Sequence, residues 1–237
     1  MTQPLSQFDK YQQTLPDIAI QLYPQQHRSR EVVEGFIHDT FKHAYGAEIS
    51  HFLPQLMAVQ RGEKTEAALG LCHADDHSPL FLECYLDTPL EQVLAEQFQR
   101  PISRQRIVEV GNLAAAPPGA ARYLFMALNA YLLGAGTEWA VFTAVPRVIN
   151  SFAKLGIQLQ PIAEATIERL PEPQGVWGSY YESQPQVVVG NVAYGAERIA
   201  TLIQHTGSGA LQNLWDTAVF AGEQRRLQAT AQPLTIL

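Results

Sequence analysis

Residues 106–156 read RIVEVGNLAAAPPGAARYLFMALNAYLLGAGTEWAVFTAVPRVINSFAKLG, and this stretch decides the fold. It begins with Arg106–Ala114, a run of aliphatic and β-branched residues that predicts a strand. Ala120–Leu133 follows with apolar residues at helical spacing, and Gly134 ends that helix. The first half of the stretch is therefore a strand, a short loop and a helix.

The second half of the stretch repeats this order. Glu138–Ala144 predicts a buried strand, because its apolar residues run on without alternating with polar ones. Pro146 begins another helix at a position that proline tolerates well, and Gly156 ends it. The resulting βαβα order argues for a sheet that has helices on both faces.

The chain upstream of this unit has a different pattern, with strands close together in the sequence. Gln55–Gln60 and Glu66–Cys72 flank Arg61–Lys64, which predicts a hairpin turn. We therefore expect an antiparallel meander that joins the βαβα unit in one mixed sheet. The elements expected upstream are strands at 18–22, 55–60, 66–72 and 79–86, and helices at 29–45 and 90–98.

The chain downstream supplies more strands and two further helices. From Asn191 the composition turns helical, and Gly207–Gly209 separates the two helices. We expect a domain at residues 1–190, in which 1–25 are irregular apart from the candidate strand at 18–22, and a helical extension at 191–237 that packs on it. The predicted fold class is α/β with a mixed sheet. The strands expected downstream are at 157–162, 178–181 and 186–189.

Composition and charge narrow the classes of function. The chain has 237 residues, of which 46% are hydrophobic and 16% are charged, enough to bury one substantial core. A net charge of −7 argues against a surface that binds nucleic acid or anionic lipid. The N-terminus lacks a basic region followed by an apolar core, and no apolar run is long enough to span a bilayer. We therefore expect a cytoplasmic protein.

The cysteines and histidines do not indicate a metal site. Cys72 and Cys84 fall in neighbouring predicted strands and are expected to be reduced thiols in a cytoplasmic chain. No spacing of cysteine and histidine is typical of a zinc site, so we expect no metal.

The start of the helix at Ala120 can hold an anion. Unpaired backbone N–H groups and the positive end of the helix dipole suit a phosphate at such a place. Gly119 and the N–H groups of Ala120 and Ala121 are the candidates, and Arg122 adds a positive charge. A helix start built from small residues after a strand usually serves tight packing alone.

The region also resembles the GNAT acyltransferases. Trp139–Ala144 is followed by Asn150–Ile157, in which Asn and an aromatic residue precede Leu-Gly-Ile, as in the signature of that family. The resemblance implies a sheet whose two central strands splay apart around the acyl-pantetheine arm of coenzyme A or acyl carrier protein. The residues that it implies for binding this arm are Asn112, Leu113, Ala114, Gly119, Ala120, Ala121, Arg122 and Asn150.

Several less common strings are similar to the bacterial thermostable hemolysin family, whose sequences look like relatives of acyl-homoserine-lactone synthases. Those synthases share the GNAT-like fold and have a Glu-x-x-Arg motif in the strand that here carries Glu109. Asn112 occupies the position of that Arg, so the resemblance does not extend to the homoserine-lactone product. The strings are 45–49, 51–54, 81–86, 108–114, 122–125 and 177–181.

Four residues are candidates for catalysis. Glu109 lies on a strand expected at the centre of the sheet and can accept a proton from an attacking amine, or can be an ion-paired strand residue. Tyr180 and Tyr181 fall where GNAT enzymes often have a tyrosine that protonates the leaving thiolate. As an alternating strand pair, they would point one ring into the core and the other away. His51 can be a base or a solvated, capping histidine.

Other residues are candidates for binding the substrates. Asp39 and Glu48 flank the first helix and its exit loop, which commonly lines the acceptor side in GNAT enzymes. Phe142 and Thr143 belong to the second central strand, beside the implied acyl site. Asn112 can hydrogen-bond the thioester carbonyl or the pantetheine amide, or can equally satisfy a strand bulge near Gly111.

The predicted function is an N-acyltransferase that moves an acyl group from acyl carrier protein or acyl-CoA to an amine, such as an amino acid or a small amine. The loop Pro117–Gly119 departs from the usual phosphate loop of GNAT enzymes and favours a carrier protein, which presents a single phosphate. The alternatives are a membrane-active hemolysin and a non-catalytic binding module. We expect no nucleic-acid partner and at most peripheral membrane contact, with the C-terminal helices serving as a lid or a dimer contact.

Overall fold

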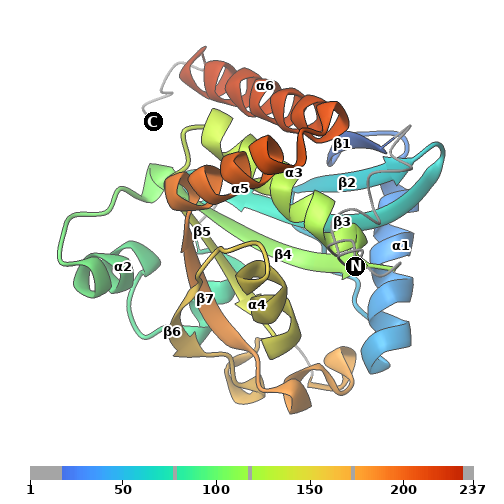
Figure 1. Cartoon of the computed structure of the whole chain (residues 1–237). Helices are drawn as coiled ribbons and strands as arrows, with labels where there is room; N and C mark the ends of the chain where they lie inside the picture. The colour runs from blue at the N-terminus through green and yellow to red at the C-terminus, as the bar shows by residue number, and fades with distance from the viewer. Residues whose placement is uncertain (1–17, 77–78, 117–118, 172–173, 232–237) are drawn as a thin grey trace, which may run out of the picture.

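A computed structural model describes residues 18–76, 79–116, 119–171 and 174–231, which form one mixed sheet with helices on both faces (Figure 1). The strand order is β1-β2-β3-β4-β5-β7-β6. Every neighbouring pair is antiparallel except β4 and β5, which are parallel. The strands are β1 (Ile18–Pro24), β2 (Gln55–Arg61), β3 (Lys64–His73), β4 (Ile107–Ala115), β5 (Trp139–Ala144), β6 (Gln160–Glu164) and β7 (Gln186–Asn191).

Two helices cover one face of the sheet, which we call the α1 face. In α1 (Arg30–Tyr45), Ile37 and Phe41 recur at helical spacing and pack against alternate residues of β2 and β3. In α2 (Leu90–Phe98), Leu90 and Leu94 pack against the other half of the sheet, formed by residues of β4, β5 and β7. Gly46, with φ of 66°, ends α1 as its spacing predicts.

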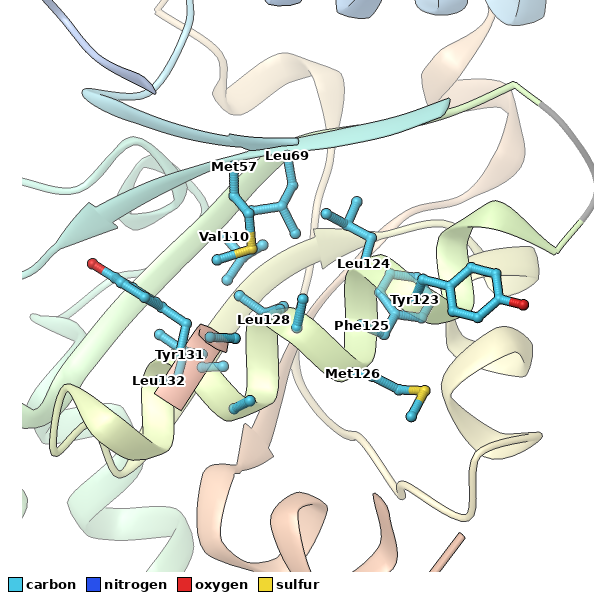
Figure 2. Packing of buried hydrophobic residues seen from close by; sticks show 14 of the residues in the cluster. Met57, Leu69, Val110, Tyr123, Leu124, Phe125, Met126, Leu128, Tyr131 and Leu132 are labelled. Atoms are coloured by element: carbon cyan, nitrogen blue, oxygen red, sulfur yellow. The ribbon is translucent and has the colours of Figure 1, made fainter. Parts of the chain in front are cut away.

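The opposite face, the α3 face, is covered by α3 (Ala120–Gly134). Figure 2 shows Leu124 and Leu128 of this helix directed at Met57, Leu69 and Val110 of the sheet. The helix is buried on most of its circumference, because two C-terminal helices pack on its outer side (Figure 1). They are α5 (Val192–Thr206) and α6 (Gly209–Ala231).

The mixed sheet, its fold class and most elements agree with the sequence predictions. The βαβα unit is present as β4, α3, β5 and α4 (Pro146–Ala153), with Pro146 in the first turn of α4. The predicted strand at 157–162 begins later, at Gln160. Pro117 and Pro118 of the predicted loop lie outside the described residues. Cys72 and Cys84 are free thiols.

Two predicted strands are wrong. Residues 79–86 form a 3₁₀ helix, η2 (Phe81–Tyr85), because side-chain carboxylates rather than a neighbouring strand accept the N–H groups of its first turn. Residues 178–181 also lie outside the sheet and lead into the 3₁₀ helix η6 (Tyr180–Ser183). There Gly178, at φ of 51°, turns the chain so that Ser179 donates its backbone N–H to the carbonyl of Tyr45. At both places apolar and aromatic side chains are buried without their backbone pairing in the sheet.

Glycine permits α3 and α6 to approach at backbone distance. A Cβ added to Gly222 would lie 2.0 Å from the carbonyl oxygen of Tyr131, and one added to Gly134 would lie 2.1 Å from that of Val219. No side-chain atom could move to relieve either clash, since both partners are backbone.

We predict that Gly222→Ala lowers the free energy of unfolding by about 3 kcal/mol, because overpacking forces the two helices apart. Gly35→Ala is the matched control, since its added Cβ meets nothing within 4 Å. That control should be neutral or stabilising, because alanine favours a helix interior by about 1 kcal/mol over glycine. Urea unfolding of both variants measures the effect, and equal midpoints for Gly222→Ala and the wild type would contradict the packing described.

Candidate active site

The sheet opens at its centre, where β4 and β5 part. They pair from Ile107 opposite Trp139 only as far as Val110 opposite Phe142. Beyond that point β4 continues along β3, and β5 continues along β7. The splayed strands that the GNAT resemblance implied are therefore present, and a pocket occupies the gap.

A β-bulge in β4 accompanies the divergence. Gly70 of β3 pairs with Gly111 and Ala68 pairs with Ala114, so β4 has two residues where β3 has one. An extra residue of this kind bends its strand and increases the local twist. The bulge contains Asn112, whose φ of 51° is unusual for a residue other than glycine.

The side chain of Asn112 ties the bulge to the loop that precedes β2. Its Oδ1 accepts the backbone N–H of Leu53 at 2.9 Å, and its Nδ2 donates to the carbonyl of His51 at 3.0 Å. Gly70 makes room for this amide, since a Cβ there would lie 2.7 Å from Oδ1. Of the roles considered for Asn112, the structure shows the structural one at the bulge.

The pocket is lined from both faces of the sheet, and the two sides differ in chemistry. The α3 side is apolar, whereas the α1 side is aromatic and polar. The apolar side is formed by Leu69, Val110, Phe125, Leu128, Phe142 and Phe152, and the polar side includes Tyr45, His51, Tyr85, Glu109, Arg147 and Tyr181.

Glu109 is buried on the polar side of the pocket, with 4% of its surface exposed. Its two carboxylate oxygens accept the backbone N–H groups of Phe81, at 2.9 Å, and Leu82, at 3.0 Å. Burial raises its pKa to about 7, and the two hydrogen bonds oppose that rise without cancelling it. Each oxygen has a further lone pair, so the carboxylate can also accept a proton from a ligand.

A second carboxylate holds η2 in place. Both guanidinium Nη atoms of Arg104 donate to Glu83 at 2.8 Å, and the backbone N–H groups of Leu80 and Leu90 donate to the same carboxylate. The hydrogen bonds from Arg104 lower the pKa of Glu83 to about 2. The ion pair of Glu83 and Arg104, which is charged at neutral pH, thus holds the segment whose backbone N–H groups donate to Glu109.

Tyrosine hydroxyls line the polar side. The hydroxyls of Tyr85 and Tyr181 form a short hydrogen bond, and that of Tyr180 donates to the carbonyl of Thr143 at 3.4 Å. Burial raises the pKa values of Tyr85 and Tyr180, so both stay protonated at neutral pH. Tyr180 and Tyr181 both line the pocket, contrary to the prediction that an alternating pair would point one ring away.

Half of the predicted site residues converge on this pocket. The four residues named for catalysis come from three segments that are far apart in the sequence, and the pocket brings them together with four others. The lining includes Glu109, Tyr180, Tyr181 and His51, and also Asn112, Leu113, Phe142 and Thr143.

The remaining predicted residues lie elsewhere. Gly119, at φ of 90°, caps α3 ahead of Ala120, Ala121 and Arg122, while Ala114 is buried beneath α1. Asn150 lines a separate groove behind α4. Asp39 and Glu48 are exposed on the surface beside α1, where both carboxylates bond to His38 and Glu48 also pairs with Lys42.

The sequence reasoning missed several lining residues. Tyr85 and Phe81 were assigned to a strand, and their place depends on the contact between η2 and Glu109. Tyr45 and Arg147 meet only through the tertiary fold, since 102 positions separate them. Phe125 and Phe152 fit helical core spacing, which carries no signal for a pocket wall.

Two further properties bear on the classes of function considered. Among the residues that the structure describes, no group of three or more His, Cys, Asp or Glu side chains is arranged to hold a metal ion. Within the same ranges, no helix combines the length and apolar character needed to cross a bilayer.

We predict that Glu83→Gln destabilises the protein at pH 7 by about 3 kcal/mol and flattens its acid unfolding. The folded pKa of about 2 lies below the ordinary glutamate pKa of 4.5, so the unfolded chain binds more protons between these pH values. The contribution of Glu83 is therefore complete above about pH 4.5 and lost as the pH falls to 2. Urea unfolding at a series of pH values measures this. Glu63→Gln, in the exposed hairpin turn, should behave as wild type, and a parallel pH dependence in Glu83→Gln would contradict this role of the ion pair.

Several proteins of known structure share this architecture. A search of curated proteins finds no match. Among solved structures, the N-acyl amino acid synthase FeeM from uncultured soil microbes is 14% identical, with a TM-score of 0.54 over 78% of this chain and 96% of FeeM. The CoA-dependent acyl-homoserine lactone synthase BjaI, solved with SAM and isopentyl-CoA, is 12% identical, with a TM-score of 0.52 over 83% and 98%. The AHL synthase LasI is 13% identical, with a TM-score of 0.50 over 74% and 90%.

At these identities the likeness shows a shared fold. The family is established by sequence, since the model described as thermostable hemolysin matches residues 23–196. The chain therefore belongs to the thermostable hemolysin family.

Proposed function

We propose that this protein is an N-acyltransferase that moves an acyl group from a thioester donor to an amine. The observation that carries the proposal is the position of Glu109. Its carboxyl, with a pKa of about 7, is buried on the polar side of a pocket whose other side is apolar. A base whose pKa lies near the working pH is what removal of a proton from an amine requires.

The apolar side of the pocket suits the acyl chain of the donor. Phe125, Phe142 and Phe152 offer a wall with no polar side-chain atom, and the chain would leave water on entering it. The pantetheine arm would then lie between β4 and β5, beside the bulge at Asn112. A bulge leaves a residue outside the strand ladder, so its backbone N–H can face a thioester carbonyl.

The donor is coenzyme A or, more in keeping with the loop before α3, acyl carrier protein. Gly119 and the N–H groups of Ala120 and Ala121 form the helix start that would take a phosphate, with Arg122 beside it. This short set of donors fits the single phosphate of a carrier-bound pantetheine better than the pyrophosphate of coenzyme A.

The reaction would proceed by direct attack. The amine nitrogen attacks the thioester carbonyl carbon, its proton passes to the Glu109 carboxylate, and the carbon–sulfur bond breaks as the amide forms. Tyr181, backed by the hydroxyl of Tyr85, would hydrogen-bond the departing thiolate. The proton on Glu109 then passes to the thiolate or to solvent, which restores the base. His51, exposed at the edge of the pocket, is a second candidate base.

The structural neighbours support this proposal by their activities. FeeM and LasI are named as synthases of N-acyl amino acids and acyl-homoserine lactones, and both share this fold. The acceptor in this chain need not be that of the lactone synthases. Asn112 stands at the Arg position of their Glu-x-x-Arg motif, and here it is bonded to the loop at His51 and Leu53.

We expect kcat/KM for acylation of an amine to rise with pH and level off above about pH 7, as Glu109 loses its proton. Glu109→Gln should reduce kcat/KM by about 100-fold or more and remove the inflection near pH 7. Mass spectrometry of the products, with acyl carrier protein and acyl-CoA donors against amines and amino acids, provides the assay. Glu182→Gln, an exposed carboxylate in η6, is the matched control. A folded Glu109→Gln variant with an unchanged pH profile would remove Glu109 from the mechanism.

The aromatic wall should set the acyl length. Phe152 stacks on Phe125 at 4.0 Å and contacts Phe142 at 5.3 Å between ring centroids. Behind these three rings lies a second apolar hollow, lined by Leu132 and Ile157 among others. We predict that Phe152→Ala joins the two spaces and shifts the preferred donor to longer chains by about tenfold in relative kcat/KM, since each methylene in an apolar site is worth about 1 kcal/mol or more.

Phe220→Ala, on the exposed side of α6, serves as the control for loss of a phenylalanine. Competition between donors of different chain length, read in one reaction by mass spectrometry, gives the preference directly. An unchanged preference in Phe152→Ala would place the acyl chain elsewhere. Phe152→Leu, a milder truncation, should shift the preference in the same direction.

A further inference from the structure

Arg147 places a positive charge at the polar side of the pocket. It stands in the first turn of α4 and reaches the C-terminal end of α1, where its Nη2 donates to the hydroxyl of Tyr45 at 2.6 Å. Its guanidinium carbon also lies 4.9 Å from the centre of the Tyr45 ring. Both contacts hold the guanidinium in one position at the mouth of the pocket.

Tyr45 is itself fixed, so the position of Arg147 is built into the fold. The Tyr45 ring packs edge-on against Tyr180, at 5.1 Å between centroids, and at a tilt against Phe41, at 5.8 Å. The carbonyl of Tyr45 accepts the backbone N–H of Ser179 at 2.9 Å. A guanidinium held in this way loses less conformational freedom when it binds an anion.

Within the described part of the chain, Arg147 forms no ion pair with a carboxylate. Arg104 and Arg30, by contrast, are each held by glutamates. Tyr45 satisfies one donor of Arg147 and leaves the forked edge of the guanidinium able to take an anion. The pocket therefore offers a positioned cation for a negatively charged group of the ligand.

The charge lies on the acceptor side rather than on the donor side. Arg147 contacts α1, and Glu109 contacts η2. Both of these elements lie on the α1 face of the sheet or at its end. The helix start that would take the donor phosphate belongs to α3, on the opposite face. A carboxylate and a cation on the same side of the pocket match the two charged groups of an amino acid.

We infer that Arg147, positioned by Tyr45, binds the carboxylate of an amino-acid acceptor whose amino group is directed at Glu109. This inference rests on the proposed function and narrows its acceptor from amines in general to α-amino acids. The products would be N-acyl amino acids, in which the acyl chain lies against the phenylalanine wall and the carboxylate meets Arg147.

Binding of product analogues tests this without turnover. N-decanoylglycine and N-decanoylglycinamide have the same size, but only the first carries a carboxylate at neutral pH. Isothermal titration calorimetry should show that the wild type binds the acid about 10- to 100-fold more tightly than the amide, as expected for a charge-assisted hydrogen bond. Arg147→Gln should abolish this preference, and Arg147→Lys should retain part of it because the charge remains without the fork. Lys154→Gln, an exposed cation at the other end of α4, is the matched control and should retain it in full.

Three outcomes would overturn the inference. If Arg147→Gln retains the preference for the acid, the carboxylate is bound elsewhere. If Arg147→Gln instead weakens binding of S-decanoyl-4′-phosphopantetheine while its preference for the acid persists, Arg147 serves the donor phosphate. If neither acid nor amide binds the wild type, the proposed function fails, and the assignment of Arg147 fails with it.

Discussion

The site depends on one constraint, the β-bulge that Asn112 stabilises in the central strand. β4 leaves its parallel partner after Val110, and the two hydrogen bonds from the Asn112 amide to the 51–53 loop hold the diverging strand in place. Without that divergence β4 and β5 would pair along their length, and no pocket would pass between the two faces. Gly70 is part of the same constraint, because any side chain there would displace the amide. A left-handed, non-glycine residue in a central strand thus coincides with the gap that the site requires.

Two carboxylates of the site differ in how they titrate. Glu83 stays ionised at neutral pH, whereas Glu109 gains or loses its proton near pH 7. Glu83 and Glu109 both accept backbone N–H groups of the same segment, yet their pKa values move in opposite directions. Arg104 offsets the burial of Glu83, whereas no guanidinium within the described part of the chain pairs with Glu109. The stability that Glu109 contributes is therefore present below about pH 4.5 and declines as the pH rises towards 7, because the unfolded chain releases this proton while the folded state still holds it. Such a cost is typical of a residue retained for chemistry rather than for folding.

The sequence predicted the architecture well and the site in part, and the difference has a physical cause. The βαβα unit, the hairpin and the helix caps follow from local periodicity and glycine placement, so they were predictable. Glu109 could be named as a candidate because it lies in the strand that carries the Glu-x-x-Arg motif in the family resemblance, beside the implied acyl site. Tyr85 was missed because η2 is formed by carboxylates that lie near it only in the folded chain, and Arg147 because its partner Tyr45 is on a distant helix. The strand predicted at 178–181 failed for the same reason, since Gly178 is placed by the end of α1.

The name of the family describes lysis, whereas the function proposed for the pocket is chemistry on an acyl thioester. The central claim is that an acyl chain enters between β4 and β5 and ends against Phe125, Phe142 and Phe152. An S-acyl-pantetheine with a photoreactive diazirine at the end of its chain tests this most directly, with peptide mapping by mass spectrometry after irradiation. The account predicts labelling in α3, β5 or α4 at these phenylalanines, and competition by an unlabelled acyl donor. Labelling confined to exposed α6 residues such as Phe220 and Leu227, unaffected by competitor, would contradict it.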